Sequence, residues 1–250
     1  MEMNTTNPVL NRKFWSSAYG NDRMSIEGSL NKIGILLGVT ILSAIITAVL
    51  SLNAMSQGDG GALLGGLAGI GMIGGLVMSL VIIFKRPQQP ATMMTLYAIF
   101  EGMFIGALSI FFESSFSGIV FQAAFGTMCI TLTMYGAYAS KMLRPTPTFN
   151  KVVGGLMASI FMLYLISLVL RMFSGFDVPF LHSSGPIGIG VTAFILVIAA
   201  LTLISDFGFI ESGVRYGAPK NMEWYAAFGI LVSLIWIYIE MLRLLSKLRD

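Results

Sequence analysis

Seven long apolar runs, separated by short polar links, dominate the pattern of the chain. Each run has about 20 residues, the length that an α-helix needs to cross a ~30 Å hydrocarbon core. We therefore predict an all-α membrane protein with seven transmembrane helices in one bundle. The predicted spans are residues 30–52, 63–84, 92–112, 118–140, 150–173, 187–210 and 224–246.

The second run, GALLGGLAGIGMIGGLVMSL, is dense in glycine. In water this composition would argue against a helix. In lipid, every backbone polar group must be satisfied within the protein, so a closely packed helix is the better interpretation. Two further glycine pairs, Gly34 with Gly38 and Gly102 with Gly106, have the spacing of close helix contacts, and we expect them to pack against other helices.

Composition supports the membrane assignment. Of the 250 residues, 56% are hydrophobic and 11% are charged, whereas soluble domains have about 25% charged residues. The mean hydropathy is +0.82. A polar segment at residues 1–29 precedes a membrane domain at residues 30–250. Because the basic residues are dispersed among the links, we expect the lipid bilayer, and no nucleic acid, as a partner.

The basic residues also predict an orientation. They flank the first run and recur in the second, fourth and sixth links, whereas the first and third links have none. By the positive-inside rule, the N-terminus lies in the cytoplasm. Seven crossings then place Arg243, Lys247 and Arg249 outside, against that rule. We favour seven crossings, and a last segment that does not fully cross is the alternative.

Charge is concentrated in residues 204–223, at the junction of the last two runs. Asp206 ends one apolar run, Arg215 lies in the link, and Glu223 opens the last run. A carboxylate at the inner end of each of two consecutive spans is unusual in a chain with so few charges. This stretch is therefore the first candidate for a functional site.

Glu101 lies near the middle of the third predicted span. An acid at that depth costs on the order of 2.5–3.5 kcal/mol on insertion scales, so it must be protonated, paired or facing water. One interpretation is a proton-sensing or cation-sensing group in a cavity. The other is a neutral side chain that is hydrogen-bonded between helices.

The last two spans each have a polar face. Thr192, Ala199, Thr202 and Asp206 share one face of the sixth span, and polar positions recur every seven residues in the seventh. Polar faces avoid lipid, so the two helices would share a hydrated seam. For Glu240, a local ion pair with Arg243 is the alternative. The positions in the seventh span are Ala226, Ser233, Glu240 and Lys247.

The fourth span has a face of small or weakly polar residues that would either pack against another helix or line a water path. We expect packing, and we interpret Cys129 as a small packing residue. The residues of this face are Gln122, Gly126, Cys129, Thr133, Gly136 and Ser140.

Motifs for catalysis are missing from the sequence. One cysteine and one histidine give no zinc or haem spacing, and neither a GxSxG nor a GxxxxGK[ST] motif occurs. We therefore expect no enzymatic activity and no cofactor.

Four stretches resemble the bacterial branch of the Bax inhibitor-1 family, the transmembrane Bax inhibitor motif proteins. The resemblance implies seven transmembrane helices and a pH-sensitive calcium leak. It also implies a pair of aspartates on the last two long helices that share a proton and gate the path. The stretches are NPVLNRKFW (7–15), YAIFEGMFIGALSIFFE (97–113), PFLHSSGPIGIG (179–190) and the final block, residues 205–248.

By this resemblance, the first aspartate of the pair is Asp206, and Glu101 matches an acidic position of the third span. The second aspartate is missing, because counting back from LRLL at 242–245 places it at or near Ser233. Glu223 and Glu240 are candidate substitutes out of register. Calcium prefers several oxygen ligands, often including two or more carboxylates, so Asp206 alone makes a weak calcium ligand.

Three hypotheses follow for a protein of the bacterial cytoplasmic membrane. The first is a leak channel for calcium or protons, with Asp206 as the gate acid and Glu101 as a second acid near the cavity. Glu223, Arg215 and Glu240 would form a partner network for Asp206. The second is a non-conducting regulator that binds another membrane protein, such as a quality-control protease. The third is a proton-coupled transporter.

Overall fold

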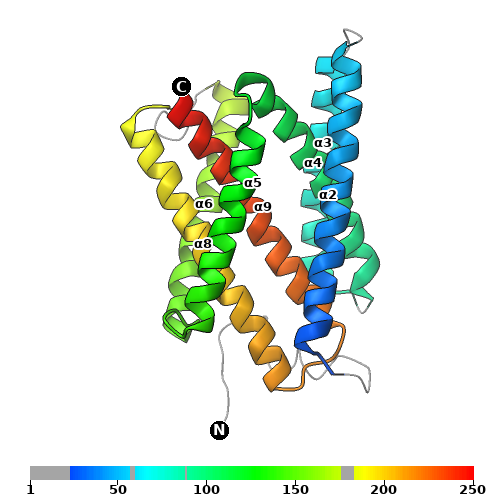
Figure 1. The fold of residues 1–250 in the computed structure, drawn as a ribbon, viewed down its shortest axis with the longest axis vertical. Helices are drawn as coiled ribbons and strands as arrows, with labels where there is room; N and C mark the ends of the chain where they lie inside the picture. Colours follow the sequence, from blue (N-terminus) through cyan, green and yellow to red (C-terminus); the bar gives the residue numbers. More distant parts are fainter. Residues whose placement is uncertain (1–22, 57–59, 88, 176–182) are drawn as a thin grey trace. The chain divides into compact units, whose positions relative to one another are not determined.

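The computed structural model of the chain describes residues 23–56, 60–87, 89–175 and 183–250. These residues form seven α-helices, each long and apolar enough to cross a membrane (Figure 1). The all-α fold and the seven predicted spans are therefore confirmed. The helices are α2 (Ile26–Ser56), α3 (Gly60–Lys85), α4 (Pro90–Ser115), α5 (Ile119–Ala139), α6 (Pro147–Ser174), α8 (Pro186–Arg215) and α9 (Met222–Arg249).

Polar residues in the links cap the helices and set their ends. Helix α2 begins at Ile26, earlier than its apolar run, because the Ser25 hydroxyl accepts a hydrogen bond from the Gly28 amide at 2.9 Å. Helix α6 begins after Thr146, whose side chain accepts from the Phe149 amide. Most of the polar segment 1–29 lies outside the described residues.

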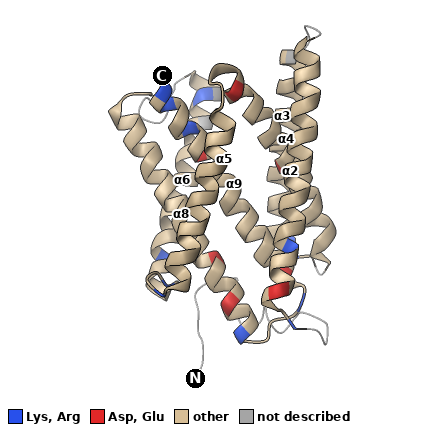
Figure 2. Ribbon diagram, in the orientation of Figure 1, with Lys and Arg blue, Asp and Glu red and all other residues tan. Residues whose placement is uncertain are grey.

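Large apolar side chains cover the outward faces of the helices. Ile41, Leu42, Leu132 and Phe161 are each more than half exposed. Charged residues gather mostly near helix ends, and long stretches between them carry none (Figure 2). An apolar surface on membrane-length helices is the surface of an integral membrane protein in contact with the lipid bilayer.

The helices form two compact units, and each is described by itself. The first unit contains the described part of Met1–Phe111 together with Phe209–Leu231. The second contains Phe112–Gly208 and Val232–Asp250. Helices α4, α8 and α9 each contribute residues to both units.

In the first unit, α4 packs closely on α2 through its glycine pair. A Cβ added at Gly102 would lie 2.6 Å from the Ser43 Cβ, and one added at Gly106 would lie 2.9 Å from the Ala44 Cα. The Ser43 hydroxyl donates to the Ile99 carbonyl at 2.8 Å across this contact. Only glycine permits this approach, so the expected packing of the pair is confirmed.

The glycine-rich α3 also packs as expected. A Cβ added at Gly71 would lie 2.5 Å from the Phe104 backbone nitrogen, and one added at Gly74 would lie 2.6 Å from the Cγ of the Phe100 ring. Glycine therefore gives α3 the space to approach α4.

The other glycine pair does not pack. A Cβ added at Gly34 or Gly38 would have nothing within 4 Å. The expectation of a close contact there is wrong, because the same spacing occurs on any helix face, whether or not a neighbour lies against it.

In the second unit, a hydrophobic core joins α6, α8 and α9. Ile160, Ile195 and Ile198 are buried, and Trp236 of α9 packs against them. This core holds together the helices that carry the polar faces described below.

The packing face predicted for α5 is only partly correct. A Cβ added at Gly126 would lie 2.8 Å from the Met241 Cε of α9, and the Gln122 side chain accepts from Arg249. Cys129 and most of the other residues of that face are exposed, and the buried residues of α5 are Ile119, Ala123 and Ala137. The Thr133 hydroxyl donates to the Cys129 carbonyl of its own helix at 2.8 Å. Because this internal bond satisfies the hydroxyl, a threonine does not require a protein neighbour.

Candidate functional site

Asp206 of α8 and Ser233 of α9 form the central contact of the second unit. The Ser233 hydroxyl donates a hydrogen bond to the Asp206 Oδ2 at 2.6 Å. Ser233 is 5% exposed and Asp206 is half-buried, so this bond is partly shielded. The residue at the expected place of a second aspartate is therefore in direct contact with the first.

Thr202 extends this contact by one step. Its hydroxyl is buried, one turn before Asp206 on α8, and lies 3.0 Å from the Ser233 oxygen, to which it donates. The same hydroxyl also lies 2.6 Å from the Ala199 carbonyl. The hydroxyls of Thr202 and Ser233 thus form a short chain that ends on a carboxylate.

The direction of these hydrogen bonds depends on whether Asp206 is protonated. An ionised carboxylate only accepts hydrogen bonds, whereas a protonated one also donates. A proton on Asp206 would therefore let the acid donate to Ser233, whose own hydroxyl would then turn to another acceptor. One proton can rearrange a bond that joins two helices.

Further contacts fix α8 beside Asp206. The Ser205 hydroxyl donates to the Asn150 side-chain oxygen of α6 at 2.9 Å. A Cβ added at Gly208 would meet Pro145, with its Cβ at 3.0 Å and its Cγ nearer still. Nothing in the sequence pattern pointed to Asn150, because it lies 55 residues from its partner.

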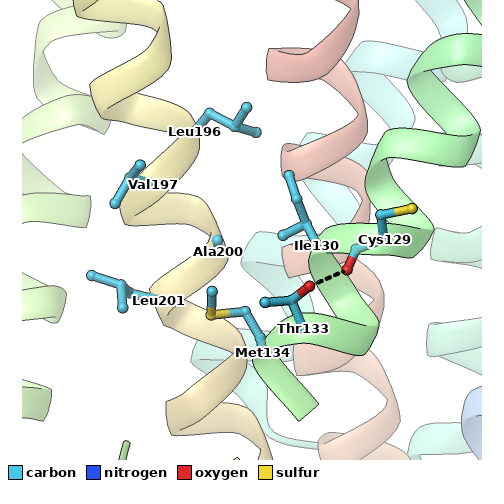
Figure 3. Close-up of a pocket in the computed structure, with 8 residues that line it drawn as sticks. All are labelled: Cys129, Ile130, Thr133, Met134, Leu196, Val197, Ala200 and Leu201. Carbon is cyan, nitrogen blue, oxygen red and sulfur yellow. Dashed lines mark hydrogen bonds between the residues drawn. The ribbon is translucent and has the colours of Figure 1, made fainter. Parts of the chain in front are cut away.

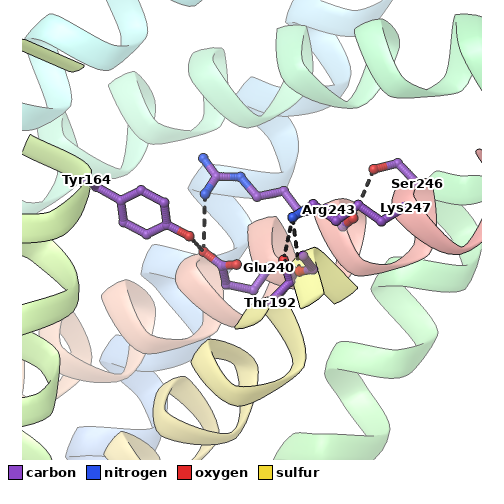
Figure 4. Close-up of polar contacts among 7 residues, drawn as sticks. Tyr164, Thr192, Glu240, Arg243, Ser246 and Lys247 are labelled. Carbon is purple, nitrogen blue, oxygen red and sulfur yellow. Dashed lines mark hydrogen bonds and ion pairs between the residues drawn. The ribbon is translucent and has the colours of Figure 1, made fainter. Parts of the chain in front are cut away.

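Glu240 lies at the centre of a second polar cluster in the same unit (Figure 4). It is 1% exposed, and its Oε1 accepts from the Tyr164 hydroxyl at 2.8 Å. The Arg243 guanidinium lies 3.4 Å from the same oxygen and 4.8 Å from the Tyr164 ring centroid. The local ion pair that was the alternative for Glu240 is present, with an aromatic ring beside it.

Lys247 continues this cluster along α9. Its ammonium donates to the Thr192 hydroxyl at 2.9 Å (Figure 4). It also donates to the Gly188 carbonyl at 3.1 Å, and both partners lie on the first turns of α8. Ser233, Glu240 and Lys247 are all buried. The polar stripe of the last helix therefore faces protein, as its pattern predicted, and its polar atoms bind other side chains and backbone groups.

Glu223 has a different set of partners, in the first unit. It is fully buried, and its Oε1 accepts from the Ser25 amide at 3.0 Å and from the Ser25 hydroxyl at 3.1 Å. Its Oε2 pairs with the Lys32 ammonium at 2.8 Å. This ion pair joins the first turns of α2 to the first turn of α9.

Glu101 is half-buried in the first unit, where α4 faces α3. Tyr97, one turn earlier, is its hydrogen-bond partner. A Cβ added at Gly75 of α3 would lie 2.8 Å from the Glu101 Oε1. The absence of a side chain at Gly75 thus leaves the space in which the acid lies.

Arg215 lies at the surface and forms an ion pair with Glu211 at 2.8 Å, with side-chain exposures of 65% and 36%. An exposed pair of this kind contributes little to stability.

The predicted site residues thus fall into separate groups. Asp206 and Ser233 are brought together, whereas Glu101, Glu223, Arg215 and Glu240 each have other partners. On α9, Glu240 lies two turns beyond Ser233, about 10 Å along the helix. Among the described residues, no group of three or more His, Cys, Asp or Glu side chains lies together.

A sequence model of the Bax inhibitor 1 like family matches residues 7–250, nearly the whole chain. The chain belongs to the Bax inhibitor 1 like family. Together with the seven membrane-length helices of the described residues, this makes it an integral membrane protein. Searches of curated proteins and of solved structures found no match.

The family match agrees with the resemblance seen in the sequence, by which Asp206 is the first aspartate of a pair. The resemblance also implied an aspartate near residue 233, where this chain has serine. A serine oxygen keeps the hydrogen bond to Asp206 but carries no charge. The contact between the last two helices therefore contains one carboxylate and one hydroxyl.

Proposed function

We propose that this protein is a pH-sensitive cation leak, for calcium in particular, in the cytoplasmic membrane of a bacterium. Its N-terminus lies in the cytoplasm, Asp206 is the gate acid, and the protein has neither enzymatic activity nor a resident cofactor. The observation that carries this proposal is the part-buried hydrogen bond from Ser233 to Asp206, between the last two helices.

Protonation supplies the switch. The ionised acid holds α9 by accepting from Ser233, whereas the protonated acid can also donate to Ser233. Because the bond is short and its serine is buried, we expect its rearrangement to change how α8 and α9 are held together. A single acid can therefore couple proton uptake to helix movement without a second carboxylate.

Cation passage makes weaker demands than stable binding. Calcium takes six to eight oxygen ligands and often several carboxylates. Asp206 offers a carboxylate, and Ser233 and Thr202 add hydroxyl oxygens beside it. Such a set suits a brief contact with a passing ion whose other ligands are waters.

The test is calcium flux into liposomes that contain the protein and a calcium indicator. We expect wild-type flux to change as the pH crosses neutrality, and Asp206→Asn to remove that change, because the amide cannot ionise. Glu211→Gln is the matched control, since it removes a carboxylate from the surface of the same helix. Absence of flux at every pH would refute the leak.

A second variant tests the role of the serine. Ser233→Asp places a carboxylate beside Asp206, where the hydroxyl now lies 2.6 Å away. Two adjacent carboxylates share a proton and titrate as a coupled pair. We expect Ser233→Asp to change the pH dependence of flux, and Ser233→Ala to alter flux with no second titrating group. Identical pH profiles for both variants would argue against a switch at this contact.

A non-conducting membrane regulator is the second candidate, and the ion pairs favour it. Lys32 with Glu223, and Arg243 with Glu240, hold helix segments together within their units. Such pairs would serve as structural contacts in a protein that binds another membrane protein, such as a quality-control protease. Cross-linking that recovers one stoichiometric partner, in a protein without flux, would support this function over the leak.

A further inference from the structure

The second unit has an open pocket between α5 and α8, with a volume of about 290 Å³ (Figure 3). Ile130 and Met134 line it from α5, and Leu196, Val197 and Leu201 line it from α8. This pocket is separate from the Asp206 contact, although Leu201 directly precedes Thr202 on α8.

The lining of the pocket is apolar. Thr133 contributes its only side-chain hydroxyl, and that hydroxyl donates to the Cys129 carbonyl within α5 at 2.8 Å (Figure 3). No polar group therefore requires a partner from an occupant. A site of this chemistry suits hydrocarbon and offers nothing that would hold a polar or charged ligand.

The depth of the pocket in the membrane determines which hydrocarbon groups surround it. Ile130 lies near the middle of the α5 span, and Val197 lies in the central part of the α8 span. Residues at this depth are surrounded by lipid acyl chains. Val197 is 56% exposed, so the pocket opens sideways to that surrounding.

We propose that this pocket binds an acyl chain of a membrane phospholipid. Its volume is at the lower limit of ordinary ligand pockets, which suits a narrow chain segment. Apolar side chains gain no hydrophobic free energy on moving from lipid to protein. Association with a helix surface in the bilayer is therefore stabilised mainly by van der Waals contact. A chain seated between Leu196 and Met134 supplies the contacts that an empty pocket lacks.

The experiment uses a phosphatidylcholine with a diazirine in the middle of one acyl chain, at a trace level in phosphatidylcholine vesicles that contain the full-length protein. After illumination, mass spectrometry maps the lipid adducts. The reference surface is the exposed face of α2 around Ile41 and Ile45, near the middle of its span. We expect adducts per exposed residue to be enriched about fivefold at the pocket, a ratio equivalent to about 1 kcal/mol.

Two variants separate the pocket from the general surface. Val197→Trp fills the pocket and should reduce its adducts to the level of the α2 surface. Val152→Trp is the matched control, because Val152 is 55% exposed on α6 and lies outside the pocket lining, and it should leave the enrichment unchanged.

Several outcomes would overturn the proposal. Equal labelling of the pocket and the α2 surface in the wild type would mean that lipid contacts the pocket only as it contacts any apolar face. Pocket residues without adducts would mean that something else, such as a second copy of the chain, covers them. Enrichment that persists in a folded Val197→Trp protein would place the labelled lipid outside the pocket.

Discussion

Replacing Gly28 with alanine sets two effects of opposite sign against each other. Gly28 lies in the first turn of α2, where alanine normally favours the helix by up to about 1 kcal/mol. A Cβ at this position, however, would lie 2.5 Å from the Glu223 Oε2 and nearer still to Oε1, whereas ordinary contacts begin at 3.4 Å. The carboxylate would have to move.

The contacts of Glu223 decide which effect is larger. Its Oε1 accepts two hydrogen bonds from Ser25, and its Oε2 pairs with Lys32 at 2.8 Å. A hydrogen bond to a charged group contributes about 1.5–3 kcal/mol, and the displaced carboxylate would lose at least one. Because Glu223 is fully buried, water cannot replace the lost partner. We expect Gly28→Ala to lower the free energy of unfolding by about 1–2 kcal/mol.

The assay is reversible unfolding in mixed micelles as the denaturing detergent fraction rises, followed by tryptophan fluorescence. Gly34→Ala on the same helix is the matched control, because a Cβ there would have nothing within 4 Å. It should leave stability unchanged or raise it. In a Glu223→Ala background the added methyl group has room, so the penalty of Gly28→Ala should disappear there.

The decisive result is whether Gly28→Ala has a lower free energy of unfolding than Gly34→Ala. If Gly28→Ala is as stable as Gly34→Ala, the buried carboxylate does not constrain this turn and the reasoning is wrong. A penalty that persists without Glu223 would show that the methyl group clashes with some other group.

Two further predictions concern the second unit. Tyr164→Phe removes the hydroxyl that donates to Glu240 but keeps the ring beside Arg243, so it should lower the free energy of unfolding by about 1–2 kcal/mol. Detergent unfolding measures this, and a change within error would mean that Trp236 and Arg243 satisfy the acid without the tyrosine hydroxyl. Glu113→Gln should lower the thermal unfolding midpoint, at a cost of about 1 kcal/mol, because the carboxylate accepts from the Gly118 amide at the start of α5. An unchanged midpoint would show that this cap adds nothing to stability.

The amino-acid sequence by itself determined the class of the protein and its helices. Membrane-length apolar runs permit one kind of local structure, because backbone groups in lipid must bond within the segment. This reasoning was correct even for the glycine-rich α3, which propensities in water would exclude. The seven-residue repeat of polar positions on the last helix correctly predicted that Ser233, Glu240 and Lys247 face inward.

The sequence was less informative where a choice between helix faces was needed. The glycine pair Gly102 and Gly106 packs against α2, whereas the equally spaced Gly34 and Gly38 have no neighbour. On α5, the weakly polar face around Cys129 is mostly exposed, and the Thr133 hydroxyl bonds to its own helix. Spacing identifies a face, but only the neighbouring helix determines whether that face is buried.

Tertiary structure alone decided the partners of the polar side chains. Asp206 bonds to Ser233, 27 residues away, and Glu223 bonds to Ser25, 198 residues away. Periodicity describes positions within one helix, and the pairing of side chains from different helices depends on how those helices cross. The sequence therefore identified the acids of this membrane protein, and the fold determined that Asp206 faces a hydroxyl while Glu223 faces an ammonium.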